Sequence, residues 1–143
     1  AVQTIAGADV VKQPADGYSI FAMSVPIAAA PAFLARMPFD VAKDLMPVAK
    51  VSTSYNVLVV HPDVAAKSVS ELVALLKANP DKMNFSSGGF GTPAHLVGEM
   101  FKVETGVKAT HVPYQQFPQA IADLLNGTNQ YMFITTLPVT GLV

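Results

Sequence analysis

The stretch "NFSSGGFGTPAHLVGEMF", residues 84–101, predicts a strand, a glycine-rich loop and a helix, in that order. Thr92 is a favourable N-cap residue, and Pro93 suits the first position of the helix. The buried side of this helix is predicted from apolar residues at helical spacing, namely Leu96, Val97, Met100 and Phe101. The loop offers backbone amides and hydroxyl groups but no charged side chain, so its role is the main question that the sequence raises.

The same alternation continues on both sides of this stretch. Strands are predicted at 82–86, 108–112 and 130–134. A second helix begins at Pro118, and its inward side is expected to consist of Ile121, Leu124 and Leu125. Because the connections are short and crossovers are right-handed, the β-α-β-α-β pattern predicts three parallel strands.

In parallel sheets of this kind, ligands bind beyond the carboxyl ends of the strands. Three segments are expected there, at 86–92, 113–117 and 135–138, and all of them lack acidic and basic residues. The sequence therefore places a candidate binding site at this edge of the sheet.

The preceding part of the chain carries weaker patterns. A helix is predicted within residues 1–13, with Ile5, Val10 and Val11 as its apolar side, and strands are predicted at 18–23 and 55–60, the latter buried on both faces. Ser68 and Glu71 have the spacing of a capping box for a helix that ends before Pro80. A boundary at His61–Pro62 would separate a partial first lobe, residues 1–60, from a second lobe, residues 61–143.

Composition excludes several classes of protein. The chain has a net charge of −1 and no basic run, so it carries no signature of a nucleic-acid-binding protein. It has no cysteine, which excludes disulfides and thiolate metal sites. Residues 17–35 are uncharged, but Pro26 and Pro31 argue against a membrane-spanning helix there. Residues 1–16 do not have the pattern of a signal peptide.

The glycine loop is predicted to bind an anion. A helix N-terminus has amides without intrahelical partners, and its dipole favours negative charge. Glycines at 88, 89 and 91 would let the backbone approach a ligand, and Ser86, Ser87 and Thr92 would add hydroxyl donors. Neutral donors suit a carboxylate. The alternative is a tight turn in which Thr92 only caps its own helix.

Two catalytic interpretations have less support. Residues 89–94 match the dinucleotide fingerprint G-x-G-x-x-A, yet no acidic residue for a ribose occurs in "THVPY", residues 110–114. The three histidines, at 61, 95 and 111, lack the spacing of metal ligands, and no nucleophile elbow surrounds the serines. We therefore expect no enzyme, no cofactor and no metal site, with a nucleotide-dependent enzyme as the alternative.

Several segments together resemble one family. The stretches "ADGYSIFAMS", "MPFDVAKDLMPVAKV", "NVLVVHPDV", "HVPYQQFPQAIADLLNG" and "YMFITTLP", with the stretch from 67 to 101, look like the Bug/TctC family. These are periplasmic solute-binding receptors of tripartite tricarboxylate transporters. The resemblance implies two α/β lobes that close on a small carboxylic acid like a Venus flytrap, as type II periplasmic binding proteins do, and membrane components of such a transporter as partners.

The resemblance also implies which residues bind the ligand. By position, these are Ser86, Ser87, Gly91 and Thr92 of the serine-glycine loop, Ser24 of the first lobe, and Thr135 and Thr136 after the last strand. Tyr114 would line the cleft or merely pack.

The sequence departs from the family pattern in three ways. Gln115 and Gln116 replace the usual lysine and glycine after the tyrosine, and Ile134 and the two threonines replace the usual Phe-Asp segment. The resemblance also implies further segments before residue 1 and after residue 143. We therefore expect an incomplete first lobe, with self-association or strand exchange, and a truncated remnant without a ligand remains a further alternative.

Overall fold

The computed structural model describes residues 3–32 and 34–136, and its contacts divide the chain into two compact units, residues 1–53 and 54–143. The sequence placed the boundary later, after residue 60. The structure differs because residues 56–60 form strand β1, which pairs with the last strand of the second unit.

The first unit is held together by short helices around a small core. Its elements are α1 (Thr4–Val10), α2 (Val25–Ala29) and the 3-10 helix η1 (Ala30–Ala32). Ile27, Ala30 and Phe39 are buried in this core. The Phe39 ring lies directly against α1, since a Cβ added at Gly7 would meet its Cε1 atom at 2.6 Å.

Two predictions for this unit were wrong. Residues 18–23 form no strand, and Tyr18 and Ile20 are 91% and 80% exposed. A strand needs a partner for its N–H and C=O groups, and within the described residues nothing pairs with this segment. Ile5, expected on the inner side of α1, is 77% exposed.

The described helices give no support for a membrane span. Within the described residues of the uncharged stretch 17–35, the helices are the five-residue α2, which has Pro26 in its first turn, and the three-residue η1. In the described part of the chain, no helix is both long and apolar enough to cross a bilayer.

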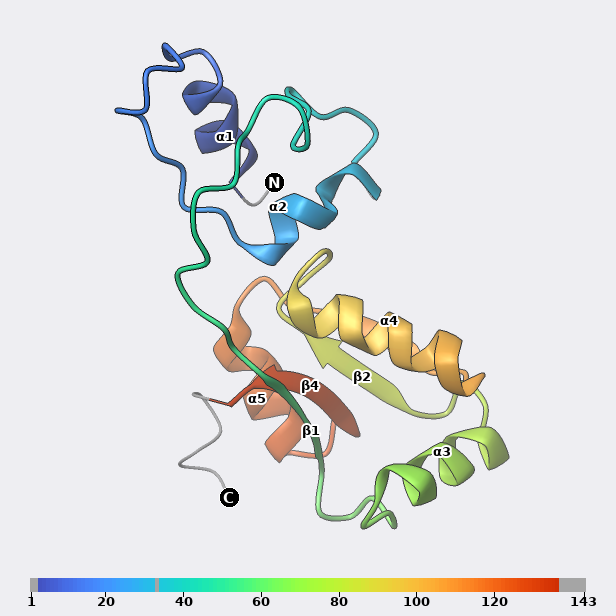
Figure 1. Cartoon of the computed structure of the whole chain (residues 1–143). Helices are drawn as coiled ribbons and strands as arrows, with labels where there is room; N and C mark the ends of the chain where they lie inside the picture. The colour runs from blue at the N-terminus through green and yellow to red at the C-terminus, as the bar shows by residue number, and fades with distance from the viewer. Residues whose placement is uncertain (1–2, 33, 137–143) are drawn as a thin grey trace. The chain divides into compact units, whose positions relative to one another are not determined.

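The second unit is a four-stranded sheet covered by helices (Figure 1). Strand β2 lies between β3 and β4 and runs parallel to both, which confirms the parallel β-α-β-α-β prediction. Strand β1 lies outside β4 and runs antiparallel to it. The elements are β1 (Asn56–Val60), α3 (Val69–Ala78), β2 (Asn84–Ser87), α4 (Pro93–Thr105), β3 (Thr110–Pro113), α5 (Phe117–Leu125) and β4 (Tyr131–Thr135).

The two faces of the sheet have separate cores. The face of Phe85 and Tyr131 packs with side chains of α3 and α4, among them Leu72, Leu76 and Phe101. The other face, that of Met132 and Ile134, packs with α5 through Ala120 and Leu124. Strand β1 was expected to be buried on both faces, but it is an edge strand and all five of its residues are half-buried.

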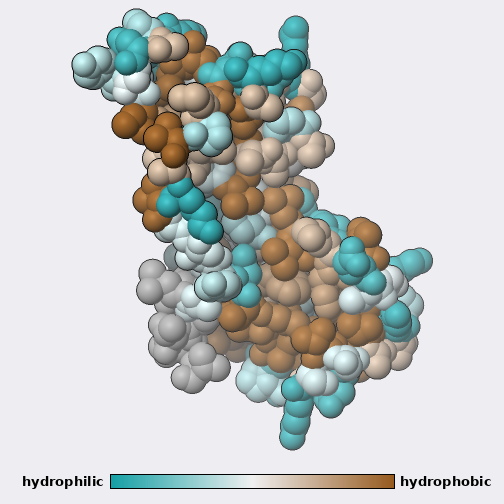
Figure 2. All heavy atoms as spheres, viewed as in Figure 1, coloured by the Kyte–Doolittle hydropathy of each residue, from teal (hydrophilic) through white to brown (hydrophobic). Residues whose placement is uncertain are grey.

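The helix faces are rotated slightly from the prediction. Helix α4 buries Ala94 and Gly98, while Met100, expected in the core, is 63% exposed. In α5, Leu124 is buried but Leu125 is 54% exposed. Small residues line the contact of α4 because the helix lies close to the sheet. Figure 2 shows hydrophobic residues on the visible face of the second unit.

The predicted helix caps are present. The Ser68 hydroxyl accepts a hydrogen bond from the Glu71 amide at 3.2 Å. The Glu71 carboxylate accepts in return from the amide of Lys67 at 2.7 Å, one residue earlier than in an ideal capping box. Gly106 ends α4 in the left-handed conformation, with φ of 69°.

Candidate functional site

The loop between β2 and α4, residues 88–92, leaves the carboxyl end of a central strand and opens a thirteen-residue helix. Gly89 and Gly91 have φ values of 107° and 77°, which side chains rarely adopt. A Cβ at Gly88 would lie 3.2 Å from the Phe117 ring, and one at Gly89 would lie 3.5 Å from the carbonyl oxygen of Tyr114. The loop therefore packs beside the segment that follows β3, as the topology predicted.

The hydroxyl of Thr92 makes two hydrogen bonds, one within the loop and one to the first turn of α4. Its hydroxyl donates to the carbonyl oxygen of Gly89 at 2.7 Å and accepts from the amide of His95 at 3.4 Å. Pro93 has no N–H, so the amide of Ala94 is the one in the first turn that neither its own helix nor this cap satisfies. Thr92 thus confirms the capping prediction, and the amide of Ala94, a buried residue, is left without a partner in its own helix or in the cap.

The two serines are placed differently from the prediction. Ser86 and Ser87 have no exposed surface, whereas the sequence suggested hydroxyls that face a ligand. The reason is that both belong to β2 itself, between two neighbouring strands. The Ser87 hydroxyl is used internally, while the buried hydroxyl of Ser86 has no hydrogen-bond partner within the described residues.

Two histidines hold the loop through hydrogen bonds, one directly and one through Ser87. The amide of Gly91 donates to Nδ1 of His95 at 3.1 Å. The amide of Gly89 donates to the Ser87 hydroxyl at 3.1 Å, and that hydroxyl lies 2.7 Å from Nε2 of His111. The spacing of His95 from the glycines was the available signal for the first contact, but only the β2–β3 pairing reveals the second.

Burial lowers the pKa of both histidines. Desolvation is the main cause for His111, whose pKa falls to about 4, with the neighbouring His95 as a second cause. Desolvation also lowers the pKa of His95, and the charges of Glu99 and Lys102 act on it in opposite directions. Both rings are therefore neutral near pH 7.

These lowered pKa values predict acid sensitivity. Below pH 6.5 the histidines of the unfolded chain bind protons, whereas the buried histidines of the folded chain do not. The free energy of unfolding is therefore highest above pH 6.5 and decreases as the pH falls towards about 4. The slope is at most about 1.4 kcal/mol per pH unit for each histidine. Urea denaturation between pH 6.5 and about 5, where most carboxylates stay charged, should show a falling midpoint. A flat midpoint would contradict the burial of these rings.

Tyr114 takes the packing role that the sequence left open. Its hydroxyl donates to the Asp123 carboxylate and accepts from the side-chain amide of Asn129, both at 2.7 Å. Asn129 is buried. Burial and the bond to Asp123 raise the pKa of Tyr114. This network ties the segment after β3 to α5 and leaves the tyrosine hydroxyl little capacity for a ligand.

The remaining predicted residues lie in two different units. The register pairs Ser86 with Met132, so Thr135 leaves the sheet at the same edge as the glycine loop. The amide of Thr136 donates to the carbonyl oxygen of Tyr55 at 3.2 Å. The other two residues of the predicted segment, Leu137 and Pro138, lie outside the described residues. Ser24 lies in the first unit, where its hydroxyl donates to Gln3 at 2.7 Å. Its role at the site stays a prediction.

A test of Thr92 separates capping from ligand contact. The change Thr92→Val should lower the free energy of unfolding by about 1 kcal/mol, because the cap of α4 is lost. If the hydroxyl also meets the ligand, affinity for a carboxylate should fall more than tenfold, which is about 1.4 kcal/mol. Chemical denaturation and calorimetric titration measure the two effects. Lower stability with unchanged affinity would leave Thr92 only its capping role.

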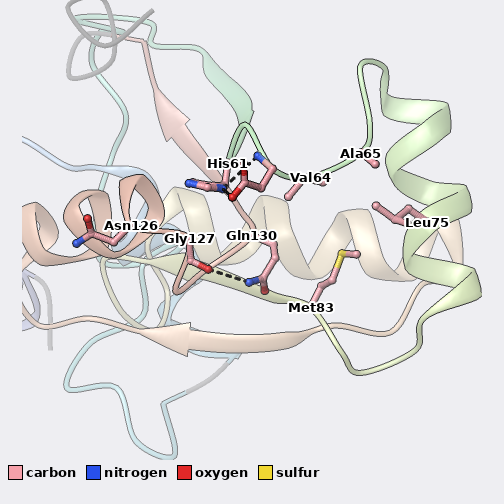
Figure 3. A pocket seen from close by; sticks show the side chains of 9 residues that line it. His61, Val64, Ala65, Leu75, Met83, Asn126, Gly127 and Gln130 are labelled. Atoms are coloured by element: carbon pink, nitrogen blue, oxygen red, sulfur yellow. Dashed lines mark hydrogen bonds and ion pairs between the residues drawn. The ribbon is translucent and has the colours of Figure 1, made fainter.

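A cavity of about 400 Å³ lies elsewhere, at the amino ends of β2 and β4 (Figure 3). Two of the polar side chains that line it, Gln130 and His61, are already engaged. Gln130 donates to the carbonyl oxygen of Gly127 at 3.1 Å and accepts from the amide of Asn84 at 2.7 Å. The His61 ring packs against Gly127 and accepts from the amide of Asp63. These contacts explain the cavity as a structural feature, so the glycine loop is the better candidate site.

A parallel sheet whose donor loop opens a helix at the carboxyl edge is the architecture of a solute-binding lobe. Solved structures agree with this. The match to Rpa4515 from R. palustris with adipate has a TM-score of 0.78 at 29% identity, and it covers 97% of this chain and 47% of Rpa4515. The periplasmic binding protein BugD has a TM-score of 0.73 at 26% identity over the whole of this chain and 48% of its own. The fold class is that of periplasmic binding proteins.

The chain belongs to the tripartite tricarboxylate transporter receptor family, TctC, whose profile matches residues 1–143. Protein BugT of Bordetella pertussis is 35% identical over 118 residues, which are 81% of this chain and 36% of BugT. A protein from the tcbD–tcbE intergenic region of Pseudomonas sp. strain P51 is 34% identical over 124 residues. The chain spans less than half the length of the relatives and structures that it matches.

Proposed function

We propose that this chain is part of a periplasmic receptor that binds a small carboxylate and delivers it to a tripartite tricarboxylate transporter. The observation that carries the proposal is the loop 88–92, which opens α4 at the carboxyl edge of the sheet and leaves the amide of Ala94 without a partner in its helix or cap. Family membership supports the role of receptor, and the adipate named with Rpa4515 supports a carboxylate. Receptors of this kind bind without catalysis.

The proposed site consists of uncharged donors. The amide of Ala94 and the hydroxyls of Thr135 and Thr136 supply it from the second unit. A carboxylate at a helix start gains roughly 0.3–1 kcal/mol from the dipole, and more when partly buried. The loop itself has no basic residue that would select a second or third negative group.

Calorimetric titration with mono-, di- and tricarboxylates, adipate among them, tests this function. The matched control is the neutral amide of each acid, which has a similar shape but no charge. We expect at least one acid to bind and its amide to bind at least tenfold more weakly. Equal binding of acid and amide, or no binding of any acid by the folded chain, would contradict the proposal.

The proposed partners include a second copy of the chain. Strands β1 and β3 form the two edges of the sheet, and edge strands are templates for pairing with another chain. Strand exchange or dimer formation should therefore appear as a concentration-dependent mass in light scattering. A constant monomer mass would leave the transporter's membrane components as the only proposed protein partners.

A further inference from the structure

Each of two histidines is linked to one amide of the glycine loop. His95 accepts directly from Gly91 through Nδ1 at 3.1 Å. His111 acts through Ser87, whose hydroxyl lies 2.7 Å from Nε2 and accepts from Gly89 at 3.1 Å. These are the two loop glycines with positive φ. The conformation of the loop thus depends on lone pairs that the imidazole rings provide.

The two rings also contact each other. Their centroids lie 4.4 Å apart, and the Phe90 ring of the loop packs edge-on against both at 5.3 Å. On the sheet side, Phe85 stacks on His111 at 4.9 Å. Two positive charges at this separation would repel each other strongly in such apolar surroundings.

Few charged groups act on this pair. In the part of the chain that the structure describes, Glu99 and Lys102 of α4 are the ones that influence both rings, and they form an ion pair with each other at 3.0 Å. Glu99 favours and Lys102 disfavours a charged imidazole, so the two effects largely oppose each other. Burial lowers the pKa of both rings.

We propose that His95 and His111 form a proton-sensitive clamp on the glycine loop, which holds Gly89 and Gly91 in place only while both rings are neutral. A protonated His95 carries a hydrogen on Nδ1 and loses its capacity to accept from Gly91. A protonated His111 repels its neighbour and carries a hydrogen on Nε2, so that it can only donate to the Ser87 hydroxyl. Acid therefore releases the loop. That this release also weakens carboxylate binding rests on the function proposed above.

Two substitutions keep the hydrogen bonds but remove the titration. In His95→Asn, the side-chain oxygen takes the place of Nδ1, and in His111→Gln, the side-chain amide takes the place of Nε2. Neither residue changes its charge with pH. Circular dichroism checks that the double variant is folded, and the single variant His95→Asn serves for Gly91 if the double variant is not.

The direct test uses the chain without ligand. Nuclear magnetic resonance follows the amides of Gly89 and Gly91 and the two imidazole rings as the pH is lowered from neutral. We expect both glycine amides to shift with the midpoint of the rings, and this shift to disappear in the double variant. The amide of Gly106, at the other end of α4, is the internal control. Glycine amides that stay constant while the rings titrate, or that shift equally in the double variant, overturn the clamp.

Adipate binding at neutral and acidic pH tests the consequence. The affinity of the natural chain should fall at least tenfold more than that of the double variant, which corrects for titration of the acid itself. An equal pH dependence in both proteins overturns the effect on binding. If adipate binds at neither pH while the glycine amides still follow the rings, the clamp is supported and the failure lies with the proposed ligand class.

Discussion

Replacement of Gly98 by alanine is expected to lower the free energy of unfolding of the second unit by about 2–3 kcal/mol. A Cβ at this position would lie 2.8 and 2.9 Å from Cδ2 and Cζ of Phe85 and nearer still to Cε2. Phe85 is fully buried and stacks on His111 and Tyr131, so its ring has little room to move. The clash outweighs the helix propensity that alanine gains over glycine, about 1 kcal/mol.

A double-mutant cycle identifies the cause of this loss. Combining Gly98→Ala with Phe85→Leu should cost less than the sum of the two single changes, because leucine leaves space for the new methyl group. Val103→Ala, on the exposed side of the same helix, is the control and should change stability little. Urea denaturation measures the natural chain and the four variants. A Gly98→Ala variant as stable as the natural chain would show that α4 does not pack on β2 as described.

Substitution of Gly91 by valine should reduce carboxylate affinity by roughly 100-fold, which corresponds to about 2.8 kcal/mol. Gly91 has φ of 77°, and a β-branched residue in this region is strained by about 1–3 kcal/mol. The loop would relieve that strain by moving the amide that now donates to His95. The start of α4, where the proposed carboxylate site lies, would then be displaced.

Gly106 provides a matched control for this variant. It also has positive φ, 69°, with open space around the position of a Cβ, but it lies at the opposite end of α4. Gly106→Val should therefore destabilise the fold by a similar amount and leave the affinity unchanged. Calorimetry and denaturation on both variants separate the two effects. An equal loss of affinity in both would assign the loss to general destabilisation and argue against the loop as the binding site.

The local signals in the sequence predicted most of the second unit. Pro93 after a threonine, Gly106 after the helix and the alternating apolar runs define each element by interactions within a few residues, and these are present in the structure. The failures depend on distant contacts. The segment 18–23 has the residue types of a strand but lacks a partner, and the β1 pairing with β4 moved the unit boundary. A sequence pattern carries no information about which partner is available.

The candidate site was predicted from the sequence about as completely as the fold. The position of the loop at the carboxyl edge follows from the topology, and Thr92 caps its helix as expected. The burial of the serine hydroxyls was missed because it depends on both neighbours of β2. The contacts of His111 and the network of Tyr114 were missed for the same reason, since each joins residues that only the folded sheet brings together.

The pairing of β1 has a consequence for how the chain acquires its structure during synthesis. Strands β2 and β3 can pair as soon as both have been made, whereas β1 must wait for β4, which follows both of them in the sequence. Until then, "YNVLVV" is an apolar segment with unsatisfied backbone groups, the kind that seeds aggregates. The yield of soluble protein should therefore depend on how quickly β4 is completed after β1.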